Sequence, residues 1–237
     1  MKFLLINPNS SQAVTEALRQ EAERCGTELL QVDVIGCPAA PRTIVTSFDE
    51  IAAGLQVVEL LRVKAREYDG AIIGCFADPG LAAAREQISI PVTGLYESSA
   101  IFARMRGRRY SIIASGSHLD ISPWIGSARA LGEMENLASV RYIDSTVERA
   151  VDVKNEKICR IIEKCRREDG ADAVILGCAA FAGRGRLLSQ MMAFPVIDGI
   201  EESVRVTEML VNHRRERGDD ERTGLDKKSN QRLSINR

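Results

Sequence analysis

The chain has 237 residues, of which 45% are hydrophobic and 27% charged, and its formal net charge is −1. These values are ordinary for a globular protein and exclude the strongly basic composition that nucleic-acid binding favours. No apolar run approaches the roughly 18 residues that a membrane span needs. The opening MKFLLINPNSS predicts a β-strand rather than a signal peptide. A cytoplasmic protein without nucleic-acid or membrane partners is therefore expected.

Short apolar runs alternate along the chain with longer amphipathic runs, which is typical of βαβ units and a parallel sheet. Strands are predicted at Phe3–Ile6, Leu29–Val34, Ala71–Gly74, Pro91–Gly94, Tyr110–Ala114, Ser139–Tyr142, Ala173–Gly177 and Pro195–Ile197. Helices are predicted at Ser10–Arg24, Ser47–Glu67, Pro79–Glu86, Glu97–Arg106, Leu119–Glu135, Ser145–Glu168, Arg184–Met191 and Gly199–Arg217. Residues 216–237 are charged and aperiodic, and they are predicted to form a disordered tail.

The chain also contains an internal repeat. The cysteines of DGAIIGCFADPG and DAVILGCAAFAG, Cys75 and Cys178, lie 103 positions apart, each after an apolar run and a glycine. PVTGLYESS and PVIDGIEES are offset by 104 positions, and FLLINPNSS and YSIIASGSH by 107. Three matches in the same order predict two pseudo-symmetric, Rossmann-like α/β lobes with mainly parallel four-stranded sheets. The first lobe is predicted at 1–95 plus about 199–215, and the second at 96–198.

Four loops are expected to meet, because ligands of open α/β sheets bind beyond the carboxyl ends of the strands. They are Asn7–Ser11, Cys75–Asp78, Ser115–Ser117 and Cys178–Phe181. If the lobes face each other across a pseudo-twofold axis, the two cysteines approach the site from opposite sides. In the second of these loops, Asp78-Pro79 has the residue types of a helix N-cap and first turn.

Two facing thiols suit the inversion of a carbon that carries an acidic hydrogen. A thiolate removes the proton from one face, and a thiol delivers a proton to the other. Backbone N–H groups, Asn9 and the loop serines would stabilise the enolate oxygen that develops. Neither a metal nor another cofactor is required where the substrate already has an activating carbonyl. The chain has only two histidines and no CxxC pairs, which disfavours a metal site and a disulfide scaffold.

A cysteine at the end of a strand is more often a small buried residue than a catalytic one. The equivalent positions of Cys75 and Cys178 in the repeat favour function for this pair. The other cysteines lack such placement and are taken as structural: Cys25, Cys37, Cys159 and Cys165.

At these motifs the chain resembles the aspartate/glutamate racemase superfamily and, within it, the hydantoin and allantoin racemases. The resemblance extends from Met1 to about Asn212 and rests on INPNSS, GCFADPGLAAARE, PVTGLYESSA, LGCAAF and PVIDGIEES. Aspartate and glutamate racemases typically have a Cys-Asn-Thr loop and a Cys-Thr-His loop. This chain has Cys75-Phe76-Ala77 and Cys178-Ala179-Ala180 instead, which disfavours an amino-acid racemase.

The resemblance implies a cofactor-independent isomerase that acts on a small molecule and assembles as a homo-oligomer. Carried onto this chain, it implies racemisation at C5 of a 5-substituted hydantoin or allantoin, with Cys75 and Cys178 as the catalytic pair. Contacts to the ring would come from Asn9, Ser10, Ser11, Phe76, Ser115, Gly116 and the backbone of Ala179. The chain departs from the family at Ala180, where glycine is usual, and at Val45, where glutamate is usual.

Alternatives remain open at this point. Within the superfamily they are an aspartate or glutamate racemase, a maleate isomerase and an arylmalonate decarboxylase, although the last typically has one catalytic cysteine. Outside it, the same lobes would suit a non-catalytic metabolite-binding protein or a redox pair of thiols. The side chains of Pro41–Phe48 and Phe181 are the candidates for contacts to the C5 substituent.

Overall fold

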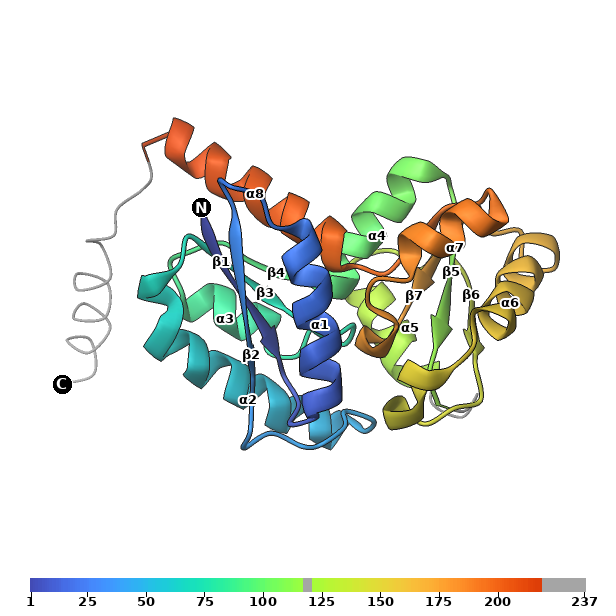
Figure 1. Cartoon of the computed structure of the whole chain (residues 1–237), viewed down its shortest axis with the longest axis horizontal. Helices are drawn as coiled ribbons and strands as arrows, with labels where there is room; N and C mark the ends of the chain where they lie inside the picture. Colours follow the sequence, from blue (N-terminus) through green and yellow to red (C-terminus); the bar gives the residue numbers. More distant parts are fainter. Residues whose placement is uncertain (117–120, 219–237) are drawn as a thin grey trace.

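Two four-stranded, all-parallel sheets organise the computed structural model, which describes residues 1–116 and 121–218 (Figure 1). The first has the order β2-β1-β3-β4 and the second the order β6-β5-β7-β8. The first contains β1 (Lys2–Asn7), β2 (Gln31–Gly36), β3 (Gly70–Ile73) and β4 (Val92–Gly94). The second contains β5 (Tyr110–Ala114), β6 (Leu137–Tyr142), β7 (Ala173–Leu176) and β8 (Val196–Ile197). The predicted α/β class and the two lobes with parallel sheets are confirmed.

The internal repeat extends to the pairing of the strands. Phe3 pairs with Gly70 in the first sheet, and Tyr110 pairs with Ala173 in the second. The two pairs are related by the offsets of 107 and 103 positions that the sequence contains. The central strands therefore have the same register in both sheets, and the two repeated cysteines follow them at equivalent points.

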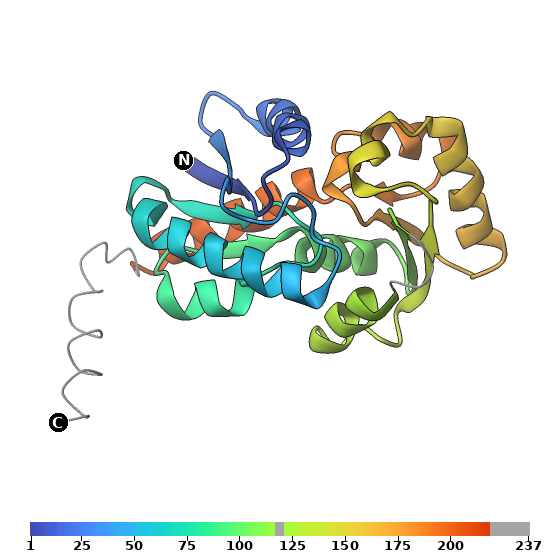
Figure 2. The same ribbon diagram turned by 90° about the horizontal axis from the view of Figure 1, so that it is seen from below.

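Helices separate most successive strands, as in βαβ units (Figures 1 and 2). They are α1 (Gln12–Cys25), α2 (Ser47–Lys64), α3 (Leu81–Gln87), α4 (Leu95–Arg106), α5 (Ile121–Ala130), α6 (Asn155–Arg167), α7 (Gly185–Met192) and α8 (Ile200–Glu216). Among the described residues the chain also forms three short 3-10 helices: Ala65–Glu67, Val147–Asp152 and Ala179–Phe181. Among residues 1–116 and 121–218, no helix is long and apolar enough to cross a membrane.

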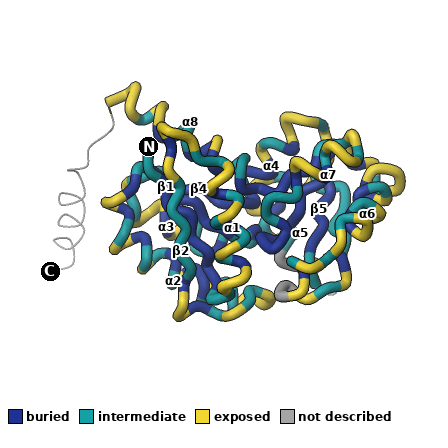
Figure 3. Tube along the Cα trace, in the orientation of Figure 1, coloured by how far each residue is buried: buried dark blue, intermediate teal, exposed yellow. Residues whose placement is uncertain are grey.

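Both faces of the central strands are buried, which explains their continuous apolar runs. In β1, Phe3 and Leu5 pack with α1 and α8, whereas Leu4 and Ile6 pack with α2 and α3. This is the alternation that the pleat of a strand imposes. The buried strands thus lie inside a layer of helices with exposed outer faces (Figure 3).

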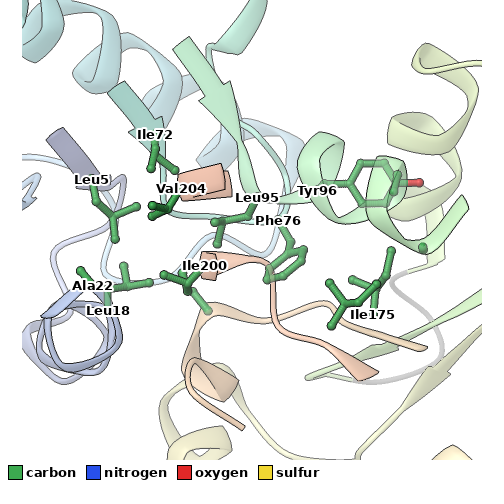
Figure 4. Packing of buried hydrophobic residues seen from close by; sticks show 14 of the residues in the cluster. Leu5, Leu18, Ala22, Ile72, Phe76, Leu95, Tyr96, Ile175, Ile200 and Val204 are labelled. Carbon is green, nitrogen blue, oxygen red and sulfur yellow. The ribbon is translucent and has the colours of Figure 1, made fainter. Parts of the chain in front are cut away.

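One hydrophobic core crosses the boundary between the sheets. It includes Ile72 of β3 in the first sheet, Ile175 of β7 in the second, and Phe76 and Tyr96 between them (Figure 4). The Tyr96 hydroxyl is 2.9 Å from the Tyr110 hydroxyl, which ties α4 to β5 inside this core. The two lobes are therefore packed against each other by shared side chains.

The predicted helix Ser145–Glu168 is wrong in its first ten residues. A 3-10 helix occupies Val147–Asp152, and α6 begins only at Asn155. The guanidinium of Arg184 donates hydrogen bonds to the carbonyls of Val151 and Val153. In a continuous helix these carbonyls would accept backbone N–H groups of the next turn. Here Arg184, which is distant in the chain, donates to them instead.

The limits of the lobes, 1–95 with about 199–215 and 96–198, stay a prediction. α8 follows the second sheet in the chain but packs on α1, α4, β3 and β4 of the first half of the molecule. Of the predicted tail 216–237, only residues 216–218 belong to the described part of the chain.

Candidate active site

A cavity of about 400 Å³ lies at the carboxyl ends of the central strands of both sheets. Its walls include residues that follow β1, β3, β5 and β7, the strands paired at the centres of the two sheets. These wall residues are Asn9, Gly74, Cys75, Phe76, Ala77, Ser115, Gly116, Gly177, Cys178, Ala179 and Ala180. The structure thus brings together the four loops that the sequence placed around one site, although Ser117 lies outside the described residues.

Cys75 is one of two thiols in the cavity wall and follows β3 after Gly74. Burial raises the pKa of its thiol to about 12, with smaller contributions from the charges of Asp78, Cys178 and Glu50. The backbone N–H of Ala77 donates a hydrogen bond to the sulfur and opposes this shift. Acidic neighbours therefore favour the protonated form of Cys75.

Cys178 is the second thiol and begins the 3-10 turn Ala179–Phe181 after β7. Burial raises the pKa of this thiol as well, but two hydrogen bonds oppose the shift. They come from the side-chain hydroxyl of Ser115 and from the backbone N–H of Ala180. The charge of Cys178 contributes to the raised pKa of Cys75, and all six cysteines of the chain are free thiols.

Asn9 presents a hydrogen-bond donor to the cavity because its acceptor is already used. Its Oδ1 accepts from the Asn7 side-chain amide at 3.0 Å and from the Ser11 backbone N–H at 2.9 Å. Asn7 is held in turn by Thr15, whose Oγ1 is 2.9 Å from the Asn7 Nδ2. The Asn9 Nδ2 has no partner among the residues that the structure describes, so this N–H₂ group can donate to a bound ligand.

The other two residues of this predicted loop lie differently. Ser11 caps α1, where its side chain accepts from the backbone N–H of Val14, and Ser10 bonds through its N–H to the carbonyl of Pro41. Neither serine lines the cavity as Asn9 does. Contacts of Ser10 and Ser11 with a substrate remain a prediction.

Asp78 does not cap the helix that follows it, contrary to the expectation from Asp78-Pro79. Helix α3 begins at Leu81, with Gly80 as its N-cap residue. The Asp78 carboxylate instead accepts from the N–H groups of Tyr96 at 3.1 Å and Glu97 at 2.9 Å, the first turn of α4. Burial raises the pKa of Asp78 to about 7, although these two hydrogen bonds lower it.

Gly94 is required by this long-range cap. A Cβ at Gly94 would lie 2.2 Å from the carboxyl carbon of Asp78, far inside van der Waals contact. The loop that carries Cys75 is therefore fixed to the start of α4 by a carboxylate for which only glycine leaves room.

The side chains around the cavity are almost all uncharged. Glu50, in the first turn of α2, is the one charged residue among the described cavity residues. No lysine, arginine or histidine of the described residues lines the cavity. A ligand with a carboxylate would find no opposite charge there.

Residues 3–207 match the Asp/Glu/hydantoin racemase family. The chain belongs to this family. A hydantoin racemase from Paenarthrobacter aurescens is 32% identical over 221 residues, which cover 89% of this chain and 91% of that protein. The structure of an allantoin racemase from Klebsiella pneumoniae is similar with a TM-score of 0.85 and 30% identity, over 90% of this chain and 88% of that one. A maleate isomerase from Pseudomonas putida shares the fold, with a TM-score of 0.68 and 13% identity over 90% of this chain and 93% of that one.

The two departures of this racemase-family chain from its relatives' usual pattern both fall in the cavity wall. Ala180 is buried, lines the cavity and donates its backbone N–H to the sulfur of Cys178. Val45 is 47% exposed and lines the cavity from the segment before α2.

Of the segments expected to contact a C5 substituent, only one reaches the cavity. Thr43, Ile44, Val45 and Thr46 line it. Phe181 does not, because it is fully buried in the core of the second sheet of this racemase-family fold.

Sequence reasoning missed several cavity residues. They are Val14, Glu50, Trp124, Ser127 and Thr146. Trp124 is the only tryptophan of the chain, and its ring meets Tyr96 edge-on with 6.4 Å between the ring centres. The only sequence signal for any of these residues was that a single tryptophan follows the loop after β5, in α5. The rest lie within helices or after an edge strand, where sequence position alone does not indicate a cavity.

Proposed function

We propose that this protein is a cofactor-independent racemase that inverts C5 of a 5-substituted hydantoin or of allantoin, with Cys75 and Cys178 as its two proton-transfer groups. The observation that carries the proposal is the placement of two thiols, from equivalent loops of the two lobes, in the wall of one cavity whose other described side chains are uncharged except for Glu50. Hydantoin and allantoin racemases among its relatives support the substrate class.

The reaction requires one thiolate and one thiol on opposite faces of C5. The thiolate takes the C5 hydrogen as a proton, and the electron pair of the C–H bond moves into the adjacent ring carbonyl to give an enolate. The opposite thiol then protonates C5 from the other face and becomes the thiolate. Hydrogen bonds from the Asn9 side-chain amide to the enolate oxygen would stabilise its charge where it develops.

Burial raises the pKa of both thiols, but their neighbours favour ionisation of Cys178 before Cys75. Each sulfur accepts a hydrogen bond from a backbone N–H, that of Ala77 or Ala180. Cys178 also accepts from the hydroxyl of Ser115, whereas Asp78 and Glu50 add negative charge near Cys75. Donated hydrogen bonds stabilise a thiolate, and nearby carboxylates destabilise it. Cys178 is therefore the thiol that ionises more readily, and it would serve as the base for the enantiomer whose C5 hydrogen faces it.

The charge of the cavity favours a neutral ring over the substrates of related reactions. Aspartate, glutamate, maleate and arylmalonates all carry carboxylates, which need a cation or a set of donors to offset their desolvation. Among the described cavity residues, Glu50 instead adds a negative charge. A racemase or decarboxylase of such acids is therefore the weaker proposal.

The decisive experiment incubates one enantiomer of several hydantoins and of allantoin in deuterated water, with a sample without enzyme as background. We expect loss of optical rotation together with incorporation of deuterium at C5. Cys75→Ser and Cys178→Ser should each lower the rate of racemisation about a thousandfold. Cys159→Ser, which replaces a cysteine of α6 outside the cavity, is the matched control and should retain the rate.

The alternatives give different results in the same experiment. Absence of inversion and of deuteration with every substrate would overturn the proposed reaction. Racemisation at the full rate by either serine variant would overturn the two-thiol mechanism. A metabolite-binding protein would keep its ligand affinity in both serine variants, and a redox pair would form a Cys75–Cys178 disulfide on mild oxidation. Assembly into a homo-oligomer stays a prediction that light scattering would test.

A further inference from the structure

Glu50 is a carboxylate in the cavity wall without a partner. It lies in the first turn of α2, is partly buried, and accepts no hydrogen bond or ion pair from any residue in the described ranges 1–116 and 121–218. Burial raises the pKa of Glu50, and no cation or donor opposes the shift. A desolvated carboxylate of this kind is strongly stabilised by any group that brings N–H donors to it.

Its neighbour Asp49 shows that this is not a property of the helix start. The Asp49 carboxylate accepts from the backbone N–H of Thr46 at 2.9 Å, from the Thr46 hydroxyl at 2.8 Å and from the N–H of Val45 at 3.2 Å. Asp49 thereby completes the capping box of α2 with Thr46. The capping role at this helix is filled, and Glu50 is left to face the cavity.

Glu50 and Cys75 line the same cavity, and the charge of Glu50 contributes to the raised pKa of that thiol. The segment Thr43–Thr46 forms the wall beside it, and the ring donor Asn9 comes from a different loop, after β1. During inversion the two sulfurs occupy the faces of C5, so the ring and the C5 substituent extend in the plane between them. The C5 substituent can then reach the wall that contains Glu50 and Thr43–Thr46.

We propose that Glu50 is a specificity-determining residue that binds a C5 substituent with N–H donors, either a ureido group or a cationic amine or guanidine. The proposal rests on the racemase function proposed above and narrows it. The two oxygens of the carboxylate match the parallel N–H groups of a ureido or guanidinium group, and an ammonium group would pair with it directly. A substituent with a carboxylate would be repelled.

The first experiment measures a ratio, the kcat/KM for a ureido- or aminoalkyl-hydantoin divided by that for an alkylhydantoin of similar size. Glu50→Gln should lower this ratio about tenfold, because a hydrogen bond to a charged group becomes one to a neutral amide. Glu59→Gln is the matched control. It removes an exposed carboxylate from the same helix, paired with Arg62 outside the cavity, and should leave the ratio as it is. An unchanged ratio in Glu50→Gln would overturn the proposal.

A second experiment separates recognition from chemistry. Hydantoins with two C5 substituents have no C5 hydrogen and cannot be racemised, so calorimetry reports their binding alone. Wild-type protein should bind 5-methyl-5-aminopropylhydantoin about tenfold more tightly than 5-methyl-5-propylhydantoin, and Glu50→Gln should lose this preference. Equal binding of both compounds by the wild type would overturn the role of Glu50. The preference without any racemisation of 5-monosubstituted hydantoins would instead overturn the proposed reaction and leave this recognition standing.

Discussion

The two thiol loops share a backbone plan and differ in their surroundings. In each loop a cysteine follows a buried strand and a glycine, and the N–H two residues further on donates to the sulfur. Cys75 faces the carboxylates of Asp78 and Glu50, whereas Cys178 receives the hydroxyl of Ser115. The repeat thus provides equivalent positions, while the neighbouring side chains make one thiol easier to ionise than the other.

The contacts between an aspartate and a glycine in the two halves also have equivalent positions but different partners. Asp78 occupies the space beside Gly94 and caps α4. In the second half, Asp198 stands at the position that corresponds to Gly94, and its carboxylate accepts from the N–H of Gly185, at the start of α7, at 2.8 Å. Each half therefore pairs an aspartate with a glycine at the start of a helix. In the first half the aspartate precedes the glycine in the chain, and in the second half it follows the glycine.

Removal of one thiol at a time should have the largest effect on the rates and should separate the roles of the two loops. We expect each serine variant to exchange the C5 hydrogen of only one enantiomer with solvent and to return it to the same face. Cys75→Ser keeps the more easily ionised thiol, so its exchange should be faster than that of Cys178→Ser at neutral pH, while racemisation in both falls about a thousandfold. NMR of C5 deuteration for each separate enantiomer measures both rates. Equal exchange of both enantiomers by either variant would contradict the assignment.

Replacement of Gly94 should break the aspartate–glycine pair of the first half. Gly94→Ala places a methyl group on the Asp78 carboxylate and should lower the free energy of unfolding by about 1–3 kcal/mol. Urea unfolding provides the measurement. Gly126→Ala is a matched control, since nothing lies within 4 Å of the added Cβ and this helix position should gain about 0.5–1 kcal/mol. A neutral Gly94→Ala would mean that the Asp78 cap tolerates displacement.

Loss of the Ser115 hydroxyl should make the two thiols more alike. Because both thiol pKa values are raised and Cys75 reaches about 12, the wild-type rate should increase with pH without a falling limb below about pH 10. Ser115→Ala removes a donor to the Cys178 thiolate, so its pKa should rise further and the rate near neutral pH should fall about tenfold. The pH profile of kcat/KM should move to higher pH by about one unit. An unshifted profile would show that Ser115 does not support the thiolate.

The smallest expected effect concerns Asp78. Its pKa is about 7 in the folded protein and lower when unfolded, so protonation of Asp78 stabilises the fold and this contribution is lost as pH rises towards 7. Asp78→Asn has no such proton. The melting temperature of the wild type should therefore fall relative to that of Asp78→Asn as the pH rises from about 4 to about 7. Parallel melting curves across that range would contradict the raised pKa.

All eight strands lie where the sequence predicts them, within a few residues. Continuous apolar runs such as Ala71–Gly74 can hardly form anything other than a strand buried on both faces. The repeat then indicates which loops meet, because equal strand order and register follow from equal spacing. The features that failed depend on contacts between residues far apart in the chain. Arg184 accompanies the break before α6, and Asp78 caps a helix 17 residues further on rather than the next one.

The cavity residues were predictable only in part for the same reason. Strand ends such as Cys75 and Cys178 can be found from local patterns. Glu50 cannot be found in this way, since its place in the cavity depends on how α2 packs near the loops that follow the central strands. Its immediate neighbour, Asp49, has the same charge and an ordinary capping role.

The last described helix covers the first sheet. Thr207 of α8 forms a 2.7 Å hydrogen bond with Thr93 of β4 inside the protein, and its methyl group fills the space above Gly70. During synthesis the second sheet can be complete while one face of the first still lacks this cover. We therefore expect the N-terminal part of the chain to reach its final packing last, after the ribosome has released residues beyond Val211.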